Sequence, residues 1–276
     1  MTIDLPFPSA QRQTPHGQRI GRAVEWRPVA APSKGTLLEG KGVRLEPIGP
    51  QHVDDLYAAL CRESDDALWT YLFWERPTDR DGMAAIVEHG VADPGQVMFA
   101  VVPVETGRAA GFCSYMRIDP AMGSVEVGGI LLGRQLQRSR AATEAMALLL
   151  RHAFDDLGYR RYEWKCDSLN APSRRAAVRL GFIWEGRFRN AVVYKGRNRD
   201  TDWFSVTDAE WPAVKAAHER WLDPANFDAA GTQLTSLSDS LSTCASLSRC
   251  SQVTGSADRK STRLNSSHTD ISRMPS

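Results

Sequence analysis

The chain has 276 residues, and its 34 Lys and Arg residues balance 33 Asp and Glu residues, which gives a formal net charge of +1 and a pI near 7.7. This balance excludes an overall electrostatic attraction to nucleic acid or to an anionic membrane. No apolar run approaches the roughly 18 residues of a membrane-spanning helix. We therefore expect no nucleic-acid partner and no membrane partner.

Cysteine and histidine spacing gives two further expectations. The five cysteines stand at scattered positions without a CxxC pair, and no basic-then-apolar signal segment opens the chain. These features predict reduced thiols and a cytoplasmic location. No Cys or His cluster has the spacing of zinc ligands, so we expect no metal.

Composition divides the chain into three parts. Residues 1–35 contain five prolines and predict an irregular N-terminal arm. Residues 36–227 predict one globular domain, and no aromatic residue follows Phe227. In the final 48 residues, 19 are Ser or Thr, so we expect residues 228–276 to be a disordered tail. Its residues 259–268 resemble translated sequencing-adapter DNA, an origin that would make the tail non-native.

The first half of the domain alternates helix and strand patterns. Apolar spacing predicts a strand over residues 43–48, followed by a helix over residues 50–60. A tryptophan-rich loop at residues 68–74 leads to a second helix over residues 79–91. Three strands separated by Gly and Pro turns are typical of an antiparallel meander. They cover residues 96–104, 110–118 and 124–132.

The second half begins with the strongest helical pattern of the chain, over residues 143–157, with Gly158 at the expected C-terminal cap. A strand over residues 159–166 and a helix over residues 173–180 follow. The last two strands cover residues 182–194 and 203–207. The expected fold class is therefore α/β (α+β), with one mixed central sheet of about seven strands flanked by helices.

The junction between strand 124–132 and the long helix is rich in arginine. Arg134, Arg138 and Arg140 lie where a helix N-terminus offers free N–H groups and the positive end of its dipole. A site for a phosphorylated ligand is one interpretation, and a solvated basic turn is the other. A P-loop is not indicated, because Arg134 and Gln135 stand where that motif needs Lys and Ser or Thr.

The same junction resembles a known family motif. Gln137-x-x-Arg140-x-Ala142 resembles the pyrophosphate-binding motif Q/R-x-x-G-x-G/A of GNAT-family N-acetyltransferases. Further matches follow in order at Thr143-Glu144-Ala145, Asn170-Ala-Pro-Ser173 and Arg179-Leu-Gly-Phe182. The resemblance covers residues 37–211 and is strongest to the branch of the ribosomal-protein N-terminal (alanine/serine) acetyltransferases.

The resemblance implies a GNAT-like acyl-CoA N-acyltransferase fold that uses acetyl-CoA as co-substrate. The cofactor-binding residues it implies are the backbone amides from Gln137 to Ala142, which cradle the pyrophosphate, and strand residues and a side chain that hold the pantetheine. By number these are Gln137, Arg138, Ser139, Arg140, Ala141 and Ala142, then Gly129, Ile130, Leu131 and Asn170. Arg140 departs from the motif's Gly, which is costly if that position needs a positive φ.

Two residues are candidates for the chemistry. Glu126 lies just before the cofactor-binding strand segment, where a carboxylate could accept the proton of an amine; the alternative is a strand ion pair. The family's tyrosine acid is replaced by Ala177, and Ser173 is the candidate hydrogen-bond donor to the leaving sulfur. Its alternative role is that of a helix N-cap. We expect direct attack of the amine on the thioester.

The acceptor is expected to be the primary amine of a small molecule or of a protein or peptide N-terminus. Trp69, Tyr71, Trp74 and Glu185 are the candidate acceptor-binding residues. The resemblance places the loop between the first two helices and the last hairpin, here the region from Arg187 to Arg199, on the acceptor side. An aromatic cluster of this kind can equally fill the core. The alternative function is a non-catalytic acyl-CoA-binding or regulatory domain. A monomer and a homodimer are both compatible with the sequence.

Overall fold

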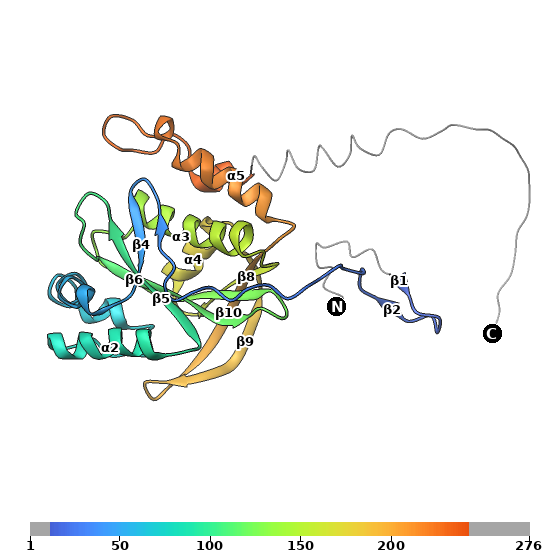
Figure 1. The fold of residues 1–276 in the computed structure, drawn as a ribbon, viewed down its shortest axis with the longest axis horizontal. Coiled ribbons are helices and arrows are strands. Elements are labelled where there is room, and N and C mark those ends of the chain that lie inside the picture. The colour runs from blue at the N-terminus through green and yellow to red at the C-terminus, as the bar shows by residue number, and fades with distance from the viewer. Residues whose placement is uncertain (1–11, 243–276) are drawn as a thin grey trace, which may run out of the picture. The chain divides into compact units, whose positions relative to one another are not determined.

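The computed structural model describes residues 12–242, and the chain divides into two compact units, one up to Pro212 and one from Ala213 on. The first unit is built on an eight-stranded sheet with the order β3-β4-β5-β6-β7-β8-β10-β9 (Figure 1). All neighbouring strands are antiparallel except β7 and β8, which are parallel. This arrangement confirms the predicted mixed sheet.

The strands of the large sheet are β3 (Leu38–Glu39), β4 (Val43–Pro47), β5 (Gln96–Pro103), β6 (Gly111–Asp119), β7 (Ser124–Leu132), β8 (Arg161–Asp167), β9 (Ile183–Tyr194) and β10 (Arg197–Thr207). Two short strands, β1 (Arg12–Gln13) and β2 (Arg19–Ile20), pair with each other.

The α-helices are α1 (Val53–Tyr57), α2 (Arg80–Ala92), α3 (Arg140–Arg151), α4 (Ala171–Arg179) and α5 (Trp211–Leu222). Short 3-10 helices cover Pro50–His52, Asp66–Trp69 and Pro224–Asn226. Single π-helical turns continue α1 over Ala58–Arg62 and α3 over His152–Asp156.

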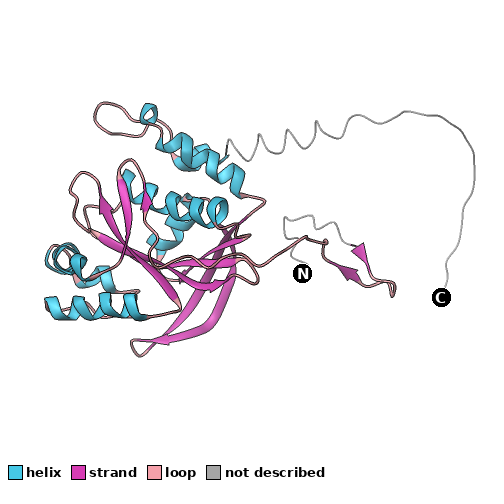
Figure 2. Cartoon of the chain, viewed as in Figure 1, coloured by secondary structure: helices cyan, strands magenta, loops and turns pink. Residues whose placement is uncertain are grey.

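Helices cover both faces of the sheet (Figures 1 and 2). On one face, Tyr115 packs edge-to-face on Phe99 with ring centroids 5.6 Å apart, and its hydroxyl donates to the Leu149 carbonyl of α3. On the other face, a Cβ at Gly90 of α2 would overlap the sulfur of Met98. Phe99 and Met98 are consecutive in β5 and point to opposite faces. Helices α3 and α2 therefore lie on opposite faces.

The structure explains the shifted starts of three predicted elements. Helix α3 begins at Arg140, three residues before the predicted start, because Ser139 accepts a hydrogen bond from Ala142 N and acts as its N-cap. Helix α4 begins at Ala171 with Asn170 as N-cap, so the alternative role of Ser173 as N-cap is wrong. Strand β10 begins at Arg197, because it forms a long hairpin with β9.

The second unit includes part of the predicted tail. Trp221 Nε1 donates to Gln233 Oε1 at 2.7 Å, and the side chain of Asn226 binds the carbonyls of Trp221 and Thr235. Leu237 is fully buried. The prediction of disorder is therefore wrong for residues 228–242, and residues 243–276 lie outside the described part of the chain.

Among residues 12–242, no helix combines the length and the hydrophobicity needed to cross a membrane.

Candidate active site

Two parallel strands separate at the centre of the large sheet. β7 and β8 pair over four residues each, and the last pair joins Val127 to Trp164. Beyond it, β7 continues to Leu132 and β8 continues to Asp167 without pairing to each other. The facing strand edges keep backbone N–H and C=O groups that a ligand can bind. The opening lies at the carboxyl ends of the parallel strands, where α/β sheets bind ligands.

A bulge in β7 follows the last pair. Phe112 and Ser114, two residues apart in β6, pair with Leu131 and Gly128, three residues apart in β7. The extra length includes Gly129, which has a φ of +56°, a conformation that favours glycine. The residues predicted to bind pantetheine, Gly129 to Leu131, therefore form an edge that is not paired to β8.

The start of α3 faces the loop that leaves β7. Ser139 Oγ accepts from Ala142 N at 3.0 Å, and the backbone N–H groups of Gln137 and Ser139 donate to carbonyls of the same loop. Three of the six amides predicted to cradle the pyrophosphate are thus used within the protein. The N–H of Ala141 lies in the first turn of the helix, where no intrahelical acceptor exists. Fewer backbone N–H groups are therefore available to bind an anion than the sequence indicated.

The arginines at this junction differ in conformation. Arg138 is exposed and has a φ of +60°, whereas Arg140 begins the helix and is not among the residues with positive φ. The departure from the motif's Gly at Arg140 therefore causes no left-handed strain there. Arg134 forms an ion pair with Asp65. Arg134 and Arg138 are both exposed, but Arg138 has no ion-pair partner among residues 12–242.

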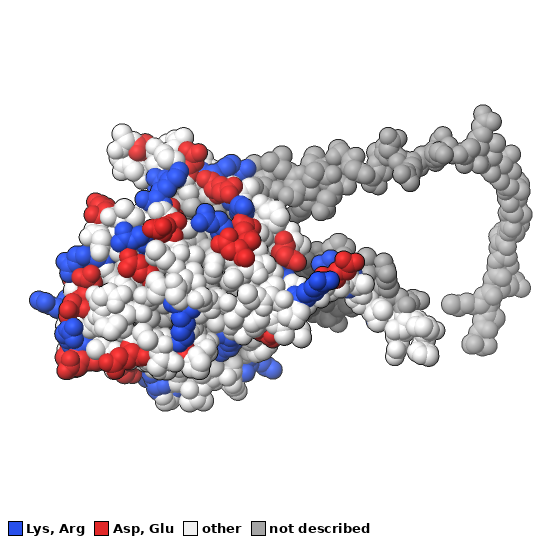
Figure 3. Space-filling model, viewed as in Figure 1, with Lys and Arg blue, Asp and Glu red and all other residues white. Residues whose placement is uncertain are grey.

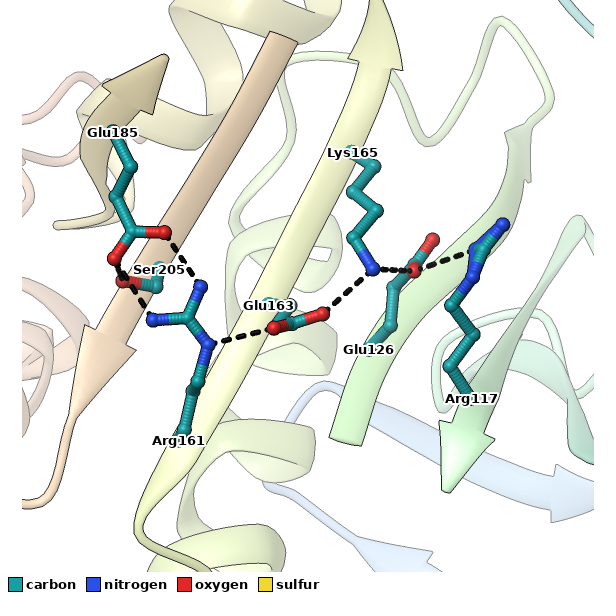
Figure 4. Close-up of polar contacts among 7 residues, drawn as sticks. All are labelled: Arg117, Glu126, Arg161, Glu163, Lys165, Glu185 and Ser205. Carbon is teal, nitrogen blue, oxygen red and sulfur yellow. Dashed lines mark hydrogen bonds and ion pairs between the residues drawn. The ribbon is translucent and has the colours of Figure 1, made fainter. Parts of the chain in front are cut away.

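Glu126 belongs to a chain of alternating charges that crosses β6, β7, β8 and β9 (Figure 4). Lys165 Nζ lies 2.9 Å from Glu126 Oε2 and 2.7 Å from Glu163 Oε2. Arg117 of β6 binds the same Glu126 oxygen at 3.0 Å. The Glu126 and Lys165 side chains are only 6% and 5% exposed. Both charges are therefore buried and compensated.

The chain of charges continues to the edge of the sheet. Arg161 binds Glu163 at 2.6 Å and Glu185 at 2.5 Å, and Ser205 Oγ donates to Glu185 at 2.7 Å. Burial raises the pKa of Glu163, but hydrogen bonds from Lys165 and Arg161 lower it by more. The Arg161 hydrogen bond lowers the pKa of Glu185 against the opposing effect of burial. Both carboxylates are stabilised in their charged form.

The second oxygen of Glu126, Oε1, lies beside Gly128. No hydrogen bond within residues 12–242 involves Oε1, and a Cβ at Gly128 would lie 3.2 Å from it. Gly128 is the first residue of β7 beyond the last pair with β8. Glu126 pairs with Met116 of β6, so the two side chains share one face of the sheet. Tyr115, the residue before Met116, points to α3. Met116 and Glu126 therefore point to the opposite face, which α2 covers. Oε1 thus borders the opening from that face.

Ser173 lies on the opposite face. Trp164 Nε1 donates to Ser173 Oγ at 3.0 Å, and Trp164 alternates with Glu163 and Lys165 along β8. Burial raises the pKa of the neighbouring Cys166 thiol, and a hydrogen bond with Ser173 partly offsets this. Asn170 uses Oδ1 to accept from Ser173 N at 3.1 Å, which leaves its amide N–H groups as donors. The two predicted catalytic residues therefore border the opening from its two faces.

The predicted acceptor-binding residues have separate roles. Trp69 is 1% exposed and its indole donates to the Leu60 carbonyl, so its assignment to acceptor binding is wrong: it fills the core. Trp74 packs edge-on against His89 and Phe112. Glu185 forms an ion pair with Arg161, so its carboxylate already has a partner within the protein.

The loop that carries Tyr71 contacts both the segment after β8 and the β9–β10 hairpin. The Tyr71 hydroxyl donates to the Leu169 carbonyl at 3.1 Å. Lys195 of the hairpin binds the Trp69 carbonyl and pairs with Glu75 at 3.2 Å. Tyr194 donates to Asp167 Oδ2 at 2.9 Å, and burial together with this bond raises its pKa to about 12. The loop and the hairpin are thus joined beside the end of β8.

Sequence reasoning missed Lys165, whereas it placed the hairpin region from Arg187 to Arg199 on the acceptor side. A signal for Lys165 was present, because Arg161, Glu163 and Lys165 occupy alternate positions and must share one face of a strand. Among the described residues, no group of three or more His, Cys, Asp or Glu side chains could hold a metal.

The chain matches known acetyltransferases. The family model described as "Acetyltransferase (GNAT) domain" matches residues 43–183. An uncharacterized N-acetyltransferase p20 of Bacillus licheniformis is 33% identical over 113 residues, 41% of this chain and 63% of that protein. The ribosomal-protein-serine acetyltransferase of Escherichia coli K12 is 24% identical over 163 residues, 56% of this chain and 87% of that protein.

Solved structures agree with these matches. A GCN5-related N-acetyltransferase from Brucella melitensis is 46% identical with a TM-score of 0.77, covering 79% of this chain and 99% of that one. The microcin C7 self-immunity acetyltransferase, solved with acetyl-CoA and AMP, shares the fold at 20% identity, with a TM-score of 0.55 over 61% of this chain and 93% of that one. The family model spans half of the sequence, and the predicted resemblance is confirmed: this chain belongs to the GNAT acetyltransferase family.

Proposed function

We propose that the chain is an acetyl-CoA-dependent N-acetyltransferase that acetylates the primary amine of a small molecule or of a protein or peptide N-terminus. The observation that carries the proposal is the opening between β7 and β8, whose unpaired β7 edge leads directly to the capped start of α3. An extended chain ending in phosphates fits this combination, because a strand edge binds amides and a helix N-terminus binds anions. Acetyl-CoA has both parts.

The proposed binding residues follow from this geometry. Gly129, Ile130 and Leu131 would pair with the pantetheine amides, and the amide N–H groups of Asn170 would donate to it. The first turn of α3 and the exposed Arg138 would hold the phosphates. When bound, acetyl-CoA supplies the acetyl group as a thioester.

Proton transfer is assigned to residues on the two faces of the opening. Glu126 Oε1 would accept the amine proton directly or through one water, while Oε2 stays bound to Lys165 and Arg117. Ser173 Oγ accepts from Trp164, and its O–H, which lies within hydrogen-bond reach of Cys166, would turn to donate to the departing sulfur when the cofactor is bound. The amine would attack the thioester directly, so no covalent acyl-enzyme intermediate would form.

A second candidate function is binding of an acyl-CoA without transfer. It is favoured by the two cations already bound to Glu126 and by Ala177, which is fully buried where the family's tyrosine acid stands. A domain of this kind would bind the cofactor and release no thiol in the presence of amines.

The distribution of charges and the state of the cysteines support the proposed acceptor class and a cytoplasmic location. Figure 3 shows positive and negative side chains interspersed over the visible face, which supports small or peptide acceptors over nucleic acid. The described cysteines, Cys61, Cys113 and Cys166, are free and buried, which fits a reducing compartment such as the cytoplasm.

The deciding experiment follows thiol release from acetyl-CoA with a panel of small amines and ribosomal-protein N-terminal peptides. Amine-dependent release with a matching acetylated product supports transfer. Acetyl-CoA binding by calorimetry without amine-dependent release would establish the second candidate, and absence of binding would contradict both.

A further inference from the structure

Unlike Arg187 of the same hairpin, Arg199 has no carboxylate partner among the described residues. Arg187 is ion-paired with Asp202 at 2.6 Å, as Arg161 of the neighbouring β8 is with Glu185. The only hydrogen bond that residues 12–242 give to Arg199 runs from Nε to Thr201 Oγ1 at 3.2 Å. Its two terminal nitrogens therefore keep donors for a further partner.

Two aromatic rings hold the Arg199 side chain in place. The guanidinium carbon lies 5.5 Å from the centroid of Phe73 and 5.8 Å from that of Tyr194. The two rings are themselves 5.5 Å apart. Cation–π contacts of this kind orient a guanidinium while leaving its edge available. Phe73 is 61% exposed, so the cluster can be reached from solvent.

The register of the sheet places Arg199 next to the proposed site. Trp203 pairs with Lys165, and Thr201 pairs with Asp167, the last residue of β8. Arg199 stands two residues further along β10, beyond the end of β8, and alternation puts it on the face of Lys165. Lys165 binds Glu126 on this face. Arg199 is therefore displaced from Glu126 toward the end at which β7 and β8 open.

Nearby acidic groups are already engaged. Asp167 accepts from Tyr194 and from the Leu169 N–H, and Asp200 accepts from Asn190 N and Asn198. A pre-oriented guanidinium with unused N–H groups, at an accessible position and without a carboxylate of its own, matches the planar pair of oxygens of a carboxylate.

We propose that Arg199, held against Phe73 and Tyr194, binds a carboxylate of the acceptor, so that the preferred acceptor is an amine that also carries a carboxylate. This inference rests on the proposed N-acetyltransferase function. Arg199 acts as a specificity-determining residue and takes no part in the proton transfers assigned to Glu126 and Ser173.

The test compares ω-amino carboxylates of two to six carbons with their matching amides as acceptors, using wild type, Arg199→Gln, Arg199→Lys and Arg197→Gln. Arg197 is an exposed arginine of the same strand and serves as the matched control. Wild type should prefer one acid to its amide by at least about tenfold in kcat/KM, and Arg199→Gln should abolish this preference by raising KM for the acid only. Arg199→Lys should retain part of it, because it keeps the charge without the fork.

A binding measurement separates this inference from the proposed function. Calorimetry with the N-acetylated acids and amides requires no turnover. Tighter binding of the acid to wild type, lost in Arg199→Gln and kept in Arg197→Gln, supports the carboxylate subsite even if no acetyl transfer is found. Two results would overturn the inference: equal binding of acid and amide by wild type, or an acid preference that survives in Arg199→Gln with an unchanged melting temperature. Arg199 would then have only a structural role, in contacts between the loop of Phe73 and the hairpin.

Discussion

Glu126 presents two different oxygens. Oε2 is bound by Lys165 and Arg117, whereas Oε1 faces Gly128 at the edge of the opening. The ion pair foreseen as an alternative exists, and it does not occupy the oxygen that the proposed reaction needs. The structural role and the proposed role as a base can therefore coexist in one side chain.

Glu126→Gln should lower kcat/KM for the amine by about 10²–10⁴, the usual contribution of general-base assistance, with little change in acetyl-CoA affinity. The loss should shrink at high pH, where solvent deprotonates the amine. Glu163→Gln is the matched control, because Glu163 binds the same Lys165 from the same face. Equal losses in both variants would assign the effect to the charge network rather than to a base at Glu126.

Arg138 allows the anion site to be tested without disturbing the backbone. Its φ of +60° is a conformation that glycine adopts without strain, so Arg138→Gly should not lower the melting temperature. It should weaken acetyl-CoA binding at least about tenfold, because a charge-assisted hydrogen bond contributes about 1.5–3 kcal/mol. Calorimetry measures the change.

Arg134→Gln is the control for Arg138, since Arg134 comes from the same loop but is paired with Asp65. Its acetyl-CoA affinity should stay close to that of wild type. An affinity that is unchanged in Arg138→Gly would remove this side chain from the proposed phosphate site.

At the scale of the elements, Arg161 links β8 to β9 through Glu163 and Glu185. The pKa values of both carboxyls lie below the ordinary value of 4.5. A group whose pKa is lowered by folding stabilises the folded state above its unfolded pKa, and this contribution is lost as the pH falls through the folded pKa.

Arg161→Gln should therefore lower the melting temperature by a constant amount above about pH 5.5, and this difference should shrink below about pH 4.5 as the carboxylates become protonated. Thermal melts between pH 3 and 8 measure it, and the exposed Arg189→Gln of β9 serves as control. A difference that is the same at all pH values would show that Arg161 acts through packing rather than through its ion pairs.

Several elements could be predicted from local pattern alone. Residues 96–103 form a nearly continuous apolar run, which is typical of a fully buried strand, and residues 140–151 have the periodicity of an amphipathic helix. The starts of helices α3 and α4 were harder to predict. Ser139 and Asn170 cap them through side-chain hydrogen bonds, which the apolar pattern does not show. The capping preference of Ser and Asn was the available signal.

The candidate site was predicted unevenly. Gly129 to Leu131 lie where the motif resemblance placed them, because the motif follows a single strand and the loop after it. Trp69 was misassigned, since local sequence does not show that its indole turns inward to the Leu60 carbonyl. Arg199 and Phe73 are far apart in sequence and meet only through tertiary packing.

At the scale of the whole molecule, the second unit holds more order than its composition indicated. Ending the chain at residue 227 instead of 242 removes Gln233, which binds Trp221, and the fully buried Leu237. Burying a leucine contributes about 1.5–3 kcal/mol, so the shorter chain should melt about 3–12 °C lower. Calorimetric melting compares the two chains.

Substitutions in the longer chain provide the control. Leu237→Ala should reproduce most of the loss, and Leu234→Ala should not, because Leu234 is 67% exposed. Identical melting of the chains ending at 227 and 242 would show that this segment contributes no stability.

The central claim is that acetyl-CoA binds along the unpaired edge of β7 and at the start of α3. Amide hydrogen exchange with and without saturating acetyl-CoA tests it directly, because unpaired amides exchange rapidly until a ligand accepts from them. We predict new protection at residues 128–132 and 138–142 and near Asn170, with weaker protection in Arg138→Gly. Binding that leaves residues 128–132 unprotected, or protection confined to another part of the chain, would contradict the account.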